Sequence, residues 1–297
     1  MNRFLEQELI QLCIEKLAGI YGSSVRLTEF KSVGGGCINH AVKISTSADD
    51  FFLKWNASAP AGMFMKEATG LNEMRLADSS LIIPEVIWSK DVDDFPGLLL
   101  IEYLQPAANL SSLDEQLGWG IAQLHRKTAS AFGFHHSNYC GTTLQDNIWT
   151  DNWPEFYAQQ RIWSLVEQIK KTRGMSSEEQ KIYEKLVVRM SDLLSHQTVP
   201  SLIHGDLWSG NYMYTANGPA LIDPACSYAD REMELGMMKL FSGFSSTVWC
   251  AYQEEFPLPE GWKERNRLYQ LYHVLNHYLL FGVSYGQQAL EIAKEYV

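Results

Sequence analysis

The passage LIHGDLWSGNYMY, residues 202–214, constrains the chain most, because it places polar side chains inside a largely apolar run. These polar residues are His204, Asp206 and Asn211. Polar groups in such a setting need hydrogen-bond partners or carry out chemistry. A further carboxylate, Asp223, follows twelve positions after Asn211, at the end of the apolar run PALI. We therefore predict a rigid loop between short strands, and Asp223 at the end of a neighbouring strand.

The apolar patterns divide the chain into a strand-rich part and a helical part. Up to about residue 104, strand-like runs surround one segment of helical spacing, MFMKEATGLNEMRLA. The strand-like runs are 25–33, 41–45, 51–55, LIIPEVIW and GLLLIEYL. Beyond residue 105 helical spacing dominates, apart from short apolar runs near residues 202–225 that are separated by a tight turn at ANG. The expected helices include EFYAQQRIWSLVEQIKK, SSEEQKIYEKLVVRMSDLLSHQ with a Ser-x-x-Glu capping signal, and the long C-terminal segment RNRLYQLYHVLNHYLLFGVSYGQQALEIAKEY. We predict an α+β, bilobal fold with a small N-terminal antiparallel β-sheet lobe that carries one key helix, residues 1–104, and a larger, mainly helical C-terminal lobe, residues 105–297.

Composition limits the partners and the compartment. The formal net charge of -11 argues against nucleic acid or an anionic membrane as the main partner. The five cysteines are scattered and form no C-x-x-C pair, which indicates reduced thiols and a cytoplasmic protein. The first 22 residues are amphipathic and carry three glutamates, so they predict a helix and not a signal peptide. No run of about 18 apolar residues exists, so we expect no membrane span.

The spacing His204-x-Asp206-x-x-x-x-Asn211, followed by Asp223, is typical of Mg²⁺-assisted phosphoryl transfer. Asp206 is the expected catalytic base, which accepts the proton of the acceptor hydroxyl. Asn211 and Asp223 offer the hard oxygen ligands that Mg²⁺ prefers. His204 is expected to brace the loop. Taken alone, the same residues also fit a capped turn of ordinary polar side chains.

Upstream residues predict a nucleotide site for ATP. Lys54 lies on the third predicted strand, where its ammonium can pair with nucleotide phosphates. Glu67 follows thirteen residues later on the predicted helix and can hold Lys54 by an ion pair. Gly34, Gly35 and Gly36 lie in the turn between the first two strands, where the absence of Cβ atoms lets the backbone approach phosphate. Three glycines alone equally fit a flexible turn.

The end of the last N-terminal strand and the segment after Asp223 narrow the class of kinase. Glu102, Tyr103 and Leu104 are expected to offer backbone donors and acceptors to adenine, although they equally fit a strand end leading into a linker. After Asp223, PACSYADRE leads to a predicted helix within about ten residues, so there is no long activation loop. The acceptor is therefore expected to be a small molecule or a small group on a larger one.

Several segments resemble the fructosamine (ketosamine) kinase family. The resemblance spans roughly Val33 to Gly282, and the tryptophan after the catalytic aspartate is its most distinctive feature. The segments are GGGCIN, FFLKWN, CGTTLQDNIWTDNWPEFYAQQRIW, HGDLWSGN, IDPACSYADREMELGMMKLFSGF and PLPEGWKERNRLYQLYHVLNHYLLFG. The resemblance implies a protein-kinase-like fold and ATP-dependent phosphorylation of a sugar hydroxyl in a ketosamine. It also implies that Asp206 is the base, that Asn211 and Asp223 are the metal ligands, and that Lys54 with Glu67 clamps the phosphates.

The chemistry of ketosamines explains what phosphorylation would achieve. An enolised ketosamine can expel its C3 substituent with the help of the nitrogen lone pair, but hydroxide leaves poorly whereas phosphate leaves well. Phosphorylation at O3 is thus expected to release the free amine without further catalysis. The ketosamine can be a small molecule or protein-bound, and a homodimer is one expectation for the assembly. The alternatives are a kinase of the aminoglycoside or choline type and a non-catalytic nucleotide-binding regulatory module.

Other residues carry both a functional and a structural interpretation. Trp208 can stack on the sugar beside Asp206 or fill space under the loop. Tyr228, Asp230 and Arg231 can contact substrate, although Asp230 equally fits the N-cap of the next helix, with Glu232 and Glu234 in its first turns.

For the histidines and Cys37 we favour the structural interpretations. His273 and His277 are spaced for a metal pair, yet no third ligand is evident and packing is the stronger interpretation. His125 is expected to be structural. Cys37, in the glycine turn, supports the hypothesis that its oxidation or an interchain disulfide suppresses nucleotide binding, against a favoured alternative of a small residue tolerated in a loop.

Overall fold

By its internal contacts the chain divides into two units. The computed structural model describes residues 2–34, 39–91, 96–107, 111–282 and 284–297. The first unit is Met1–Asn72 with Pro84–Gln105, and the second is Glu73–Ile83 with Pro106–Val297. The assignment of functional lobes to residues 1–104 and 105–297 stays a prediction.

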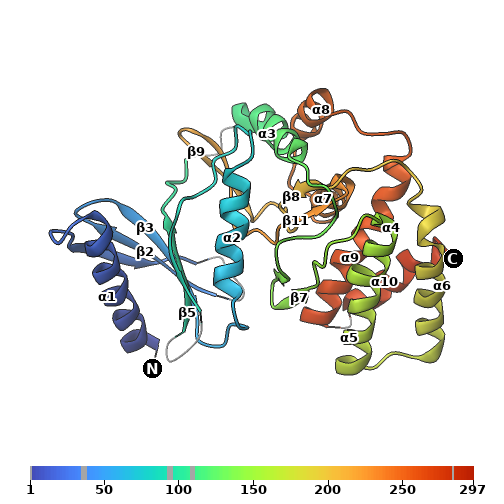
Figure 1. The fold of residues 1–297 in the computed structure, drawn as a ribbon, viewed down its shortest axis with the longest axis horizontal. Coiled ribbons are helices and arrows are strands. Elements are labelled where there is room, and N and C mark those ends of the chain that lie inside the picture. The colour runs from blue at the N-terminus through green and yellow to red at the C-terminus, as the bar shows by residue number, and fades with distance from the viewer. Residues whose placement is uncertain (1, 35–38, 92–95, 108–110, 283) are drawn as a thin grey trace. The chain divides into compact units, whose positions relative to one another are not determined.

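The first unit contains an antiparallel five-stranded sheet with the strand order β1-β2-β3-β5-β4 (Figure 1). Its strands are β1 (Leu27–Ser32), β2 (His40–Thr46), β3 (Asp50–Asn56), β4 (Val86–Lys90) and β5 (Gly97–Glu102). The central strand β3 pairs with β2 and β5, so that Lys54 lies opposite Ala41 on one side and Leu99 on the other. Hydrogen bonds on both edges of β3 therefore fix the backbone that carries Lys54.

Alternation along β3 directs its side chains to opposite faces of the sheet. Phe51, Leu53 and Trp55 are buried in a cluster that also contains the apolar residues of α1 (Asn2–Tyr21). Lys54 points to the other face, where it contacts Glu67 of α2 (Met63–Arg75). The two helices thus cover opposite faces of the sheet (Figure 1).

Helix α2 has the buried stripe that its sequence predicts. Phe64, Ala68, Leu71 and Met74, spaced by three or four residues, are all nearly inaccessible to solvent. The strand predicted within LIIPEVIW is shorter than expected, since β4 begins only at Val86, after the proline of that segment. Proline lacks the N–H that a sheet ladder needs, which explains the late start.

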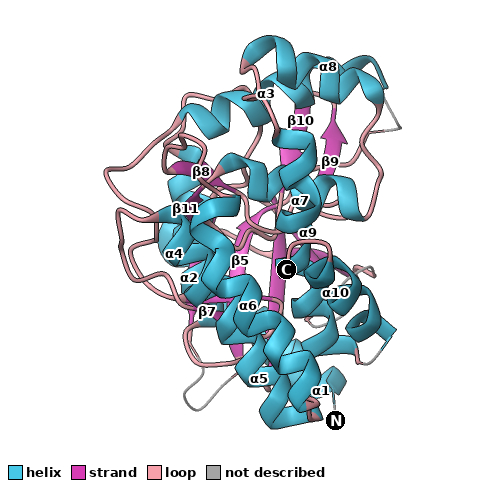
Figure 2. Ribbon diagram, turned by 90° about the vertical axis from the view of Figure 1, so that its right-hand side faces the viewer, coloured by secondary structure: helices cyan, strands magenta, loops and turns pink. Residues whose placement is uncertain are grey.

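The second unit is mainly helical, with short two-stranded ladders among the helices (Figure 2). Helix α9 contacts α5, α7 and α10, and its apolar residues belong to a buried cluster shared with these helices. The helices are α3 (Asp114–Arg126), α4 (Trp153–Phe156), α5 (Ser164–Arg173), α6 (Ser177–Leu193), α7 (Arg231–Leu240), α8 (Ser246–Glu255), α9 (Trp262–Phe281) and α10 (Ser284–Lys294), with a 3₁₀ turn at Ser111–Leu113.

The strands of this unit pair as β6 (Asn138–Cys140) with β7 (Thr143–Gln145), β8 (Ser201–Ile203) with β11 (Ser227–Ala229), and β9 (Tyr212–Thr215) with β10 (Gly218–Leu221). The tight turn predicted at ANG joins β9 to β10, as expected. The capping box predicted before α6 is also present, between Ser176 and Glu179.

Three features of the second unit differ from the sequence prediction. The helix expected over EFYAQQRIWSLVEQIKK contains a π-helical segment, Tyr157–Trp163, between α4 and α5. The long C-terminal helix is interrupted at Gly282, which has a positive φ of 107° and ends α9. The β6–β7 hairpin and α8 were not predicted, because their segments are short and carry mixed patterns. In the described part of the chain, no helix combines the length and the apolarity that a bilayer crossing requires.

Candidate active site

The loop His204–Asn211 connects β8 to β9 and carries the predicted catalytic base. Asp206 is partly exposed, whereas His204, Gly205 and Leu207 around it are buried. Strand β8 pairs with β11, which follows shortly after Asp223. The loop and the Asp223 segment are therefore brought together by the same two-stranded ladder.

Gly205 is required by the close approach of these two segments. It has a positive φ of 84°, and a Cβ atom at this position would lie 2.2 Å from the carbonyl oxygen of Ala225. The N–H of Ala225 donates a 2.8 Å hydrogen bond to the carbonyl oxygen of His204. A larger residue than glycine would therefore separate the loop from the backbone that follows Asp223.

His204 braces the loop, as predicted, through both of its ring nitrogens. Its Nε2 lies 2.8 Å from the carbonyl oxygen of Ile222, and its Nδ1 lies 3.3 Å from the backbone nitrogen of Asp206. The carbonyl accepts and the backbone N–H donates, so Nε2 carries the proton and the ring is neutral. Burial lowers the pKa of His204 and thereby favours this neutral form, although the nearby Glu234 acts in the opposite direction.

The fully buried carboxylate of Glu234, on α7, anchors the backbone of the same loop. Its Oε2 accepts a 2.5 Å hydrogen bond from the N–H of His204, and its Oε1 accepts one of 3.3 Å from the N–H of Leu207. The N–H of Gly205 lies 3.2 Å from both oxygens. One side chain thus satisfies three loop amides. Burial opposes ionisation of Glu234, but the contacts with His125, His204 and the Gly205 amide outweigh it and hold its pKa below the usual value.

His125 lies between Glu234 and Tyr252 and has the structural role that was predicted. Its Nδ1 lies 2.8 Å from the hydroxyl of Tyr252, and its Nε2 lies 3.8 Å from Glu234 Oε2. Nε2 faces a carboxylate, which only accepts, so the proton of the neutral ring is assigned to Nε2. Nδ1 then accepts from the Tyr252 hydroxyl, whose oxygen accepts from Arg231. Burial lowers the pKa of His125, against the opposing effect of Glu234.

Sequence reasoning missed the role of Glu234, which it placed with Glu232 among acids that favour a helix N-terminus. The available signal was its setting: Glu234 stands between Met233 and Leu235 on a helix whose flanking residues are all buried. An unpaired carboxylate in such a place is costly, which predicts a dedicated set of donors.

Asn211 joins the predicted base to the Asp223 segment. Its Nδ2 donates to the carbonyl oxygen of Asp206 at 2.8 Å and lies 3.3 Å from Asp206 Oδ2. The backbone carbonyl oxygen of Asn211 accepts a 3.0 Å hydrogen bond from the N–H of Ile222. Because Nδ2 is committed to Asp206, Oδ1 is the atom that Asn211 can offer to a cation. Asp223 has a φ of 58°, a left-handed conformation that is uncommon outside glycine and is concentrated at functional sites.

Trp208 lies at the surface of the loop, with 39% of its area exposed. A Cβ atom on Gly210 would lie 2.4 Å from the Trp208 ring, so the indole folds over this glycine. The W-S-G order thus lets the indole ring lie over the backbone of Gly210, because glycine has no side chain there. The structural alternative for Trp208, filling space under the loop, is disfavoured by its exposure, and its contact with substrate stays a prediction.

In the first unit, the predicted ion pair between Lys54 and Glu67 is present. Lys54 Nζ lies 3.0 Å and 3.1 Å from the two Glu67 oxygens, and both side chains are 9% exposed. A shielded pair of this kind holds the ammonium in one position. The role of the pair in binding phosphate stays a prediction.

The predicted glycine turn lies largely outside the described residues. Gly34 is described and has open space around its Cα, whereas Gly35, Gly36 and Cys37 lie outside the described part of the chain, as does the redox hypothesis for Cys37. At the other predicted nucleotide contact, the N–H groups of Glu102 and Tyr103 donate to Glu85 and Asp50 carbonyl oxygens. Their carbonyl oxygens and the N–H of Leu104 are the groups that the adenine prediction depends on.

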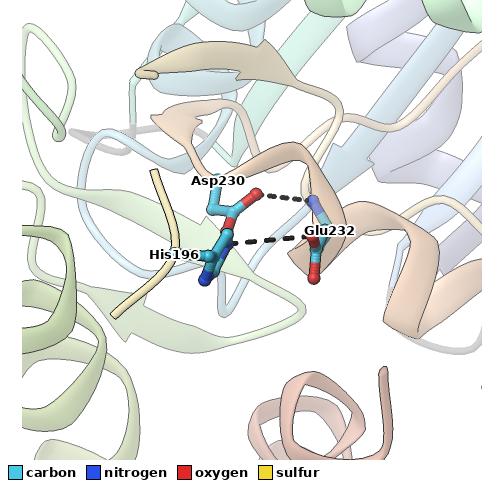
Figure 3. Close-up of side chains that lie close together, drawn as sticks. All are labelled: His196, Asp230 and Glu232. Carbon is cyan, nitrogen blue, oxygen red and sulfur yellow. Dashed lines mark hydrogen bonds and ion pairs between the residues drawn. The ribbon is translucent and has the colours of Figure 1, made fainter. Parts of the chain in front are cut away.

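Several alternative site residues have structural partners. Asp230 is the N-cap of α7, where its side chain accepts from the N–H of Glu232. Figure 3 shows Asp230 and Glu232 beside His196, whose Nε2 lies 2.7 Å from Asp230 and 3.7 Å from Glu232. These ligand types are spaced for a cation. However, Arg265 holds both oxygens of Glu232, at 2.6 and 2.8 Å, so an internal cation already neutralises the cluster.

The remaining candidates are also occupied by protein contacts. Tyr228 is buried and donates to Glu73, and Arg231 donates to the carbonyl oxygens of residues 256 and 257. His277 donates its Nδ1 proton to the carbonyl oxygen of His273, and the buried His273 has its pKa lowered to about 3 by desolvation. The packing interpretation of this histidine pair therefore fits the described structure.

The comparisons with known proteins agree with this geometry. A crystal structure of a thermostable mutant of aminoglycoside phosphotransferase APH(4)-Ia, bound to AMP-PNP and hygromycin B, is 14% identical and superposes with a TM-score of 0.62 over 95% of this chain and 97% of that one. This likeness defines the fold as protein-kinase-like.

The narrower relationship comes from sequence. The family model for fructosamine kinase matches residues 9–297. The chloroplastic protein-ribulosamine 3-kinase of Arabidopsis thaliana is 35% identical over 283 residues, covering 93% of this chain and 85% of the relative. A crystal structure assigned to the fructosamine-3-kinases, from Haemophilus somnus 129PT, has a TM-score of 0.85 and 26% identity over 96% of each chain. The chain belongs to the fructosamine kinase family.

Proposed function

We propose that the protein transfers the γ-phosphoryl group of ATP to a sugar hydroxyl, O3, of a ketosamine such as a fructosamine or ribulosamine. The observation that carries the proposal is the geometry of the loop around Asp206. Glu234 fixes the backbone of this loop, and the side-chain amide of Asn211 donates to the Asp206 carboxylate. Asp206 accepts the hydroxyl proton, since a partly exposed carboxylate on a rigid loop can meet a substrate without losing its position. The name of the Arabidopsis relative supports a ribulosamine or a similar ketosamine as acceptor.

The donor set of the second unit suits Mg²⁺. Asn211 and Asp223 supply amide and carboxylate oxygens, the hard ligands of this ion, and the orientation of Asn211 reserves Oδ1 for that purpose. When bound, Mg²⁺ neutralises charge on the nucleotide phosphates. In the first unit Lys54, held by Glu67, binds phosphate, while the glycine turn at Gly34–Gly36 and the backbone of Glu102–Leu104 contact the nucleotide. Trp208 offers its exposed indole face to the apolar face of the sugar.

We also propose a cytoplasmic location. Cys13, Cys140 and Cys250 form no disulfide, which suits a reducing compartment. A homodimer stays a prediction.

The test is phosphate transfer from Mg-ATP to a panel of ketosamines, with fructose- and ribose-derived adducts of a lysine derivative, an aminoglycoside and choline compared side by side. We expect ADP formation with the ketosamines, followed by slower release of inorganic phosphate and free amine. Phosphorus NMR locates the phosphoryl group on O3. The Asp206→Asn variant keeps the shape of the side chain and is expected to lower kcat by about a thousandfold or more, as loss of a general base together with its charge implies.

Two results would contradict the proposal. Transfer to the aminoglycoside or choline without transfer to any ketosamine would make the protein a different small-molecule kinase. An Asp206→Asn variant as active as the parent would refute the assignment of the base.

A further inference from the structure

A chain of buried polar side chains lies in the second unit, and none of its members belongs to the proposed catalytic or nucleotide-binding residues. Each of these side chains has at most 4% of its surface exposed. We call the set the amide network; its members are Asn138, Gln145, Asn147, Arg161 and Tyr272. Polar groups buried this deeply destabilise a fold unless they are hydrogen-bonded, so their partners carry information about what they hold.

The network ends on the backbone that follows Asp223. Asn138 Nδ2 donates a 2.7 Å hydrogen bond to the carbonyl oxygen of Cys226, and Gln145 Nε2 lies 3.3 Å from the carbonyl oxygen of Ala225. These carbonyl groups come two and three residues after Asp223. Two side chains from the β6–β7 hairpin therefore fix the turn that leads from the proposed metal ligand into β11.

The donors and acceptors of the network are fixed by the groups at its two ends, because a guanidinium group only donates and a backbone carbonyl group only accepts. Arg161 can only donate, so the oxygen of Asn147 accepts from its Nη2 at 2.6 Å. Asn147 must then donate its Nδ2 to the oxygen of Asn138, at 2.8 Å. Asn138 in turn directs its own Nδ2 toward the Cys226 carbonyl group, which can only accept.

A second branch reaches the same turn from α9. The hydroxyl of Tyr272 donates to Gln145 Oε1 at 2.6 Å, which leaves the Gln145 Nε2 group to donate to Asn138 Oδ1, at 3.0 Å, and to Ala225. The amide groups of Asn138 and Gln145 are thus each held in a single orientation. A network with one allowed arrangement specifies the position of the backbone it binds.

Arg161 makes the arrangement costly, which argues against incidental packing. Its guanidinium group is fully buried, and no carboxylate of the described residues lies within 4 Å of it. Its charge is met by the carbonyl oxygen of Asp146, by Asn147, and by the ring of Phe156 at 4.5 Å. Arg161 belongs to the π-helical segment Tyr157–Trp163, and π-helical turns occur frequently at functional sites.

The turn that the network holds is also tied to the catalytic loop. Ala225 donates its N–H to the carbonyl oxygen of His204, while Asp223 itself has the strained φ of 58°. Such a conformation persists only when its surroundings determine it. The catalytic loop contacts the turn through its backbone, and the amide network holds the carbonyl groups of the same turn.

We propose that Asn138, Gln145, Asn147, Arg161 and Tyr272 are positioning residues for Asp223, which hold the turn 224–226 so that the Asp223 carboxylate is presented to the metal–nucleotide complex in one orientation. The proposal rests on the proposed function, since it takes Asp223 as a metal ligand. It assigns to the β6–β7 hairpin and the π-helical segment a role in phosphoryl transfer, although neither supplies a residue that touches the substrates.

The test compares two substitutions of the same kind in the same core. Tyr272→Phe removes the hydroxyl that orients Gln145, whereas Tyr157→Phe removes an equally buried hydroxyl that donates only to the backbone of α9, at Leu268 and Tyr269. Both variants are expected to lose a similar amount of thermal stability, because each loses one buried hydrogen bond. Only Tyr272→Phe is expected to affect the Asp223 turn.

Three readouts separate positioning from stability. Amide hydrogen exchange of the ligand-free protein over residues 223–229 is expected to be faster in Tyr272→Phe and unchanged in Tyr157→Phe. Binding of Mn²⁺ in the presence of a non-hydrolysable ATP analogue, followed by its paramagnetic signal, is expected to weaken about five- to tenfold in Tyr272→Phe only. For the reaction, kcat is expected to fall about tenfold in that variant while KM for the ketosamine changes less than about twofold.

Two outcomes would refute the positioning role. If Tyr272→Phe and Tyr157→Phe lose the same stability and neither changes exchange or Mn²⁺ binding, the network is core packing and the proposal is wrong. If the parent protein with the nucleotide analogue binds no Mn²⁺, the proposal is also wrong. Should Tyr272→Phe not fold, Asn138→Ser, which removes the donor to Cys226, is tested against the same control.

Failure of the proposed function gives a different pattern. A parent protein that binds Mn²⁺ with the nucleotide analogue but phosphorylates no ketosamine would refute the acceptor. The exchange and Mn²⁺ measurements would still test the positioning role, because neither involves the acceptor.

Discussion

Replacing Glu234 with glutamine tests whether one buried carboxylate holds the catalytic loop in position. The two oxygens of Glu234 accept from the backbone N–H groups of His204, Gly205 and Leu207. Glutamine has nearly the same shape, but one of its two terminal atoms is an NH₂ group, which donates and cannot accept. Either His204 or Leu207 must therefore lose its partner, and the NH₂ group would face a backbone N–H.

The size of the effect follows from the hydrogen bonds that change. A hydrogen bond to a charged group contributes about 1.5–3 kcal/mol, and a buried N–H left without a partner costs about 1–3 kcal/mol. Since Gly205 and one further amide keep the remaining oxygen, we expect a net loss of about 2–4 kcal/mol, which falls on the loop. If about half of this free energy appears as a higher activation barrier, kcat falls about tenfold, because 1.4 kcal/mol corresponds to a factor of ten.

The assay measures kcat and KM for ketosamine phosphorylation together with unfolding in urea. Glu232→Gln is the matched control: it is two residues away on the same helix and equally buried, but its partner is Arg265 and not the loop. We expect both variants to be less stable, and only Glu234→Gln to lose kcat. Equal losses of kcat in the two variants, or an unchanged kcat in Glu234→Gln, would refute the anchoring role of Glu234.

Two further predictions concern the nucleotide and the pH dependence of stability. Lys54→Met is expected to weaken binding of an ATP analogue about tenfold or more, because it removes the ammonium that Glu67 holds; unchanged affinity by fluorescence titration would remove Lys54 from the site. His273 has a folded-state pKa of about 3 against an ordinary value of 6.5, so the unfolded chain takes up its proton first. Stability from the neutral, buried His273 is therefore complete above pH 6.5 and is lost as the pH falls toward 3. At pH 5 the loss amounts to about 2 kcal/mol. His273→Gln should flatten the loss of urea-unfolding free energy between pH 7.5 and 5 by this amount. Equal slopes in the parent and in His273→Gln would contradict the reasoning.

The parts of the fold and site that could be predicted depend on local patterns. The stripe of α2 repeats every three or four residues, and Lys54 and Glu67 lie on adjacent elements thirteen residues apart, so periodicity and spacing were enough to predict their ion pair. Asn211 also reaches a near neighbour in sequence, Asp206, five residues away, although the sequence analysis predicted the spacing of the two residues and not this hydrogen bond. In each case the partners are separated by less than one strand and one helix.

The parts that were missed depend on partners distant in sequence. Glu234 binds amides 27 to 30 residues before it, and Tyr272 binds Gln145 across 127 residues. A polar residue in an apolar segment indicates that it has a hydrogen-bond partner, but the identity of that partner follows only from the packing of the whole unit. The electrostatic setting of the active site is therefore less visible in the sequence than the residues that carry out the chemistry.

The π-helical segment has a consequence for how this region tolerates insertions and deletions. From Trp153 to Ile169, buried residues recur every fourth position, through Tyr157, Arg161 and Leu165. In an α-helix each step of four residues turns about 40° past a full circle, so four steps would rotate Ile169 about 160° away from Trp153. The wider turn of the π-helix absorbs this drift and keeps both ends facing the same core. Deleting a single residue within Tyr157–Trp163 would leave fifteen steps between Trp153 and Ile169, which in an ordinary α-helix end only about 60° past a full turn. The region is therefore expected to tolerate a deletion here by becoming a regular α-helix, whereas the same helix with all its residues requires the π-helical turn.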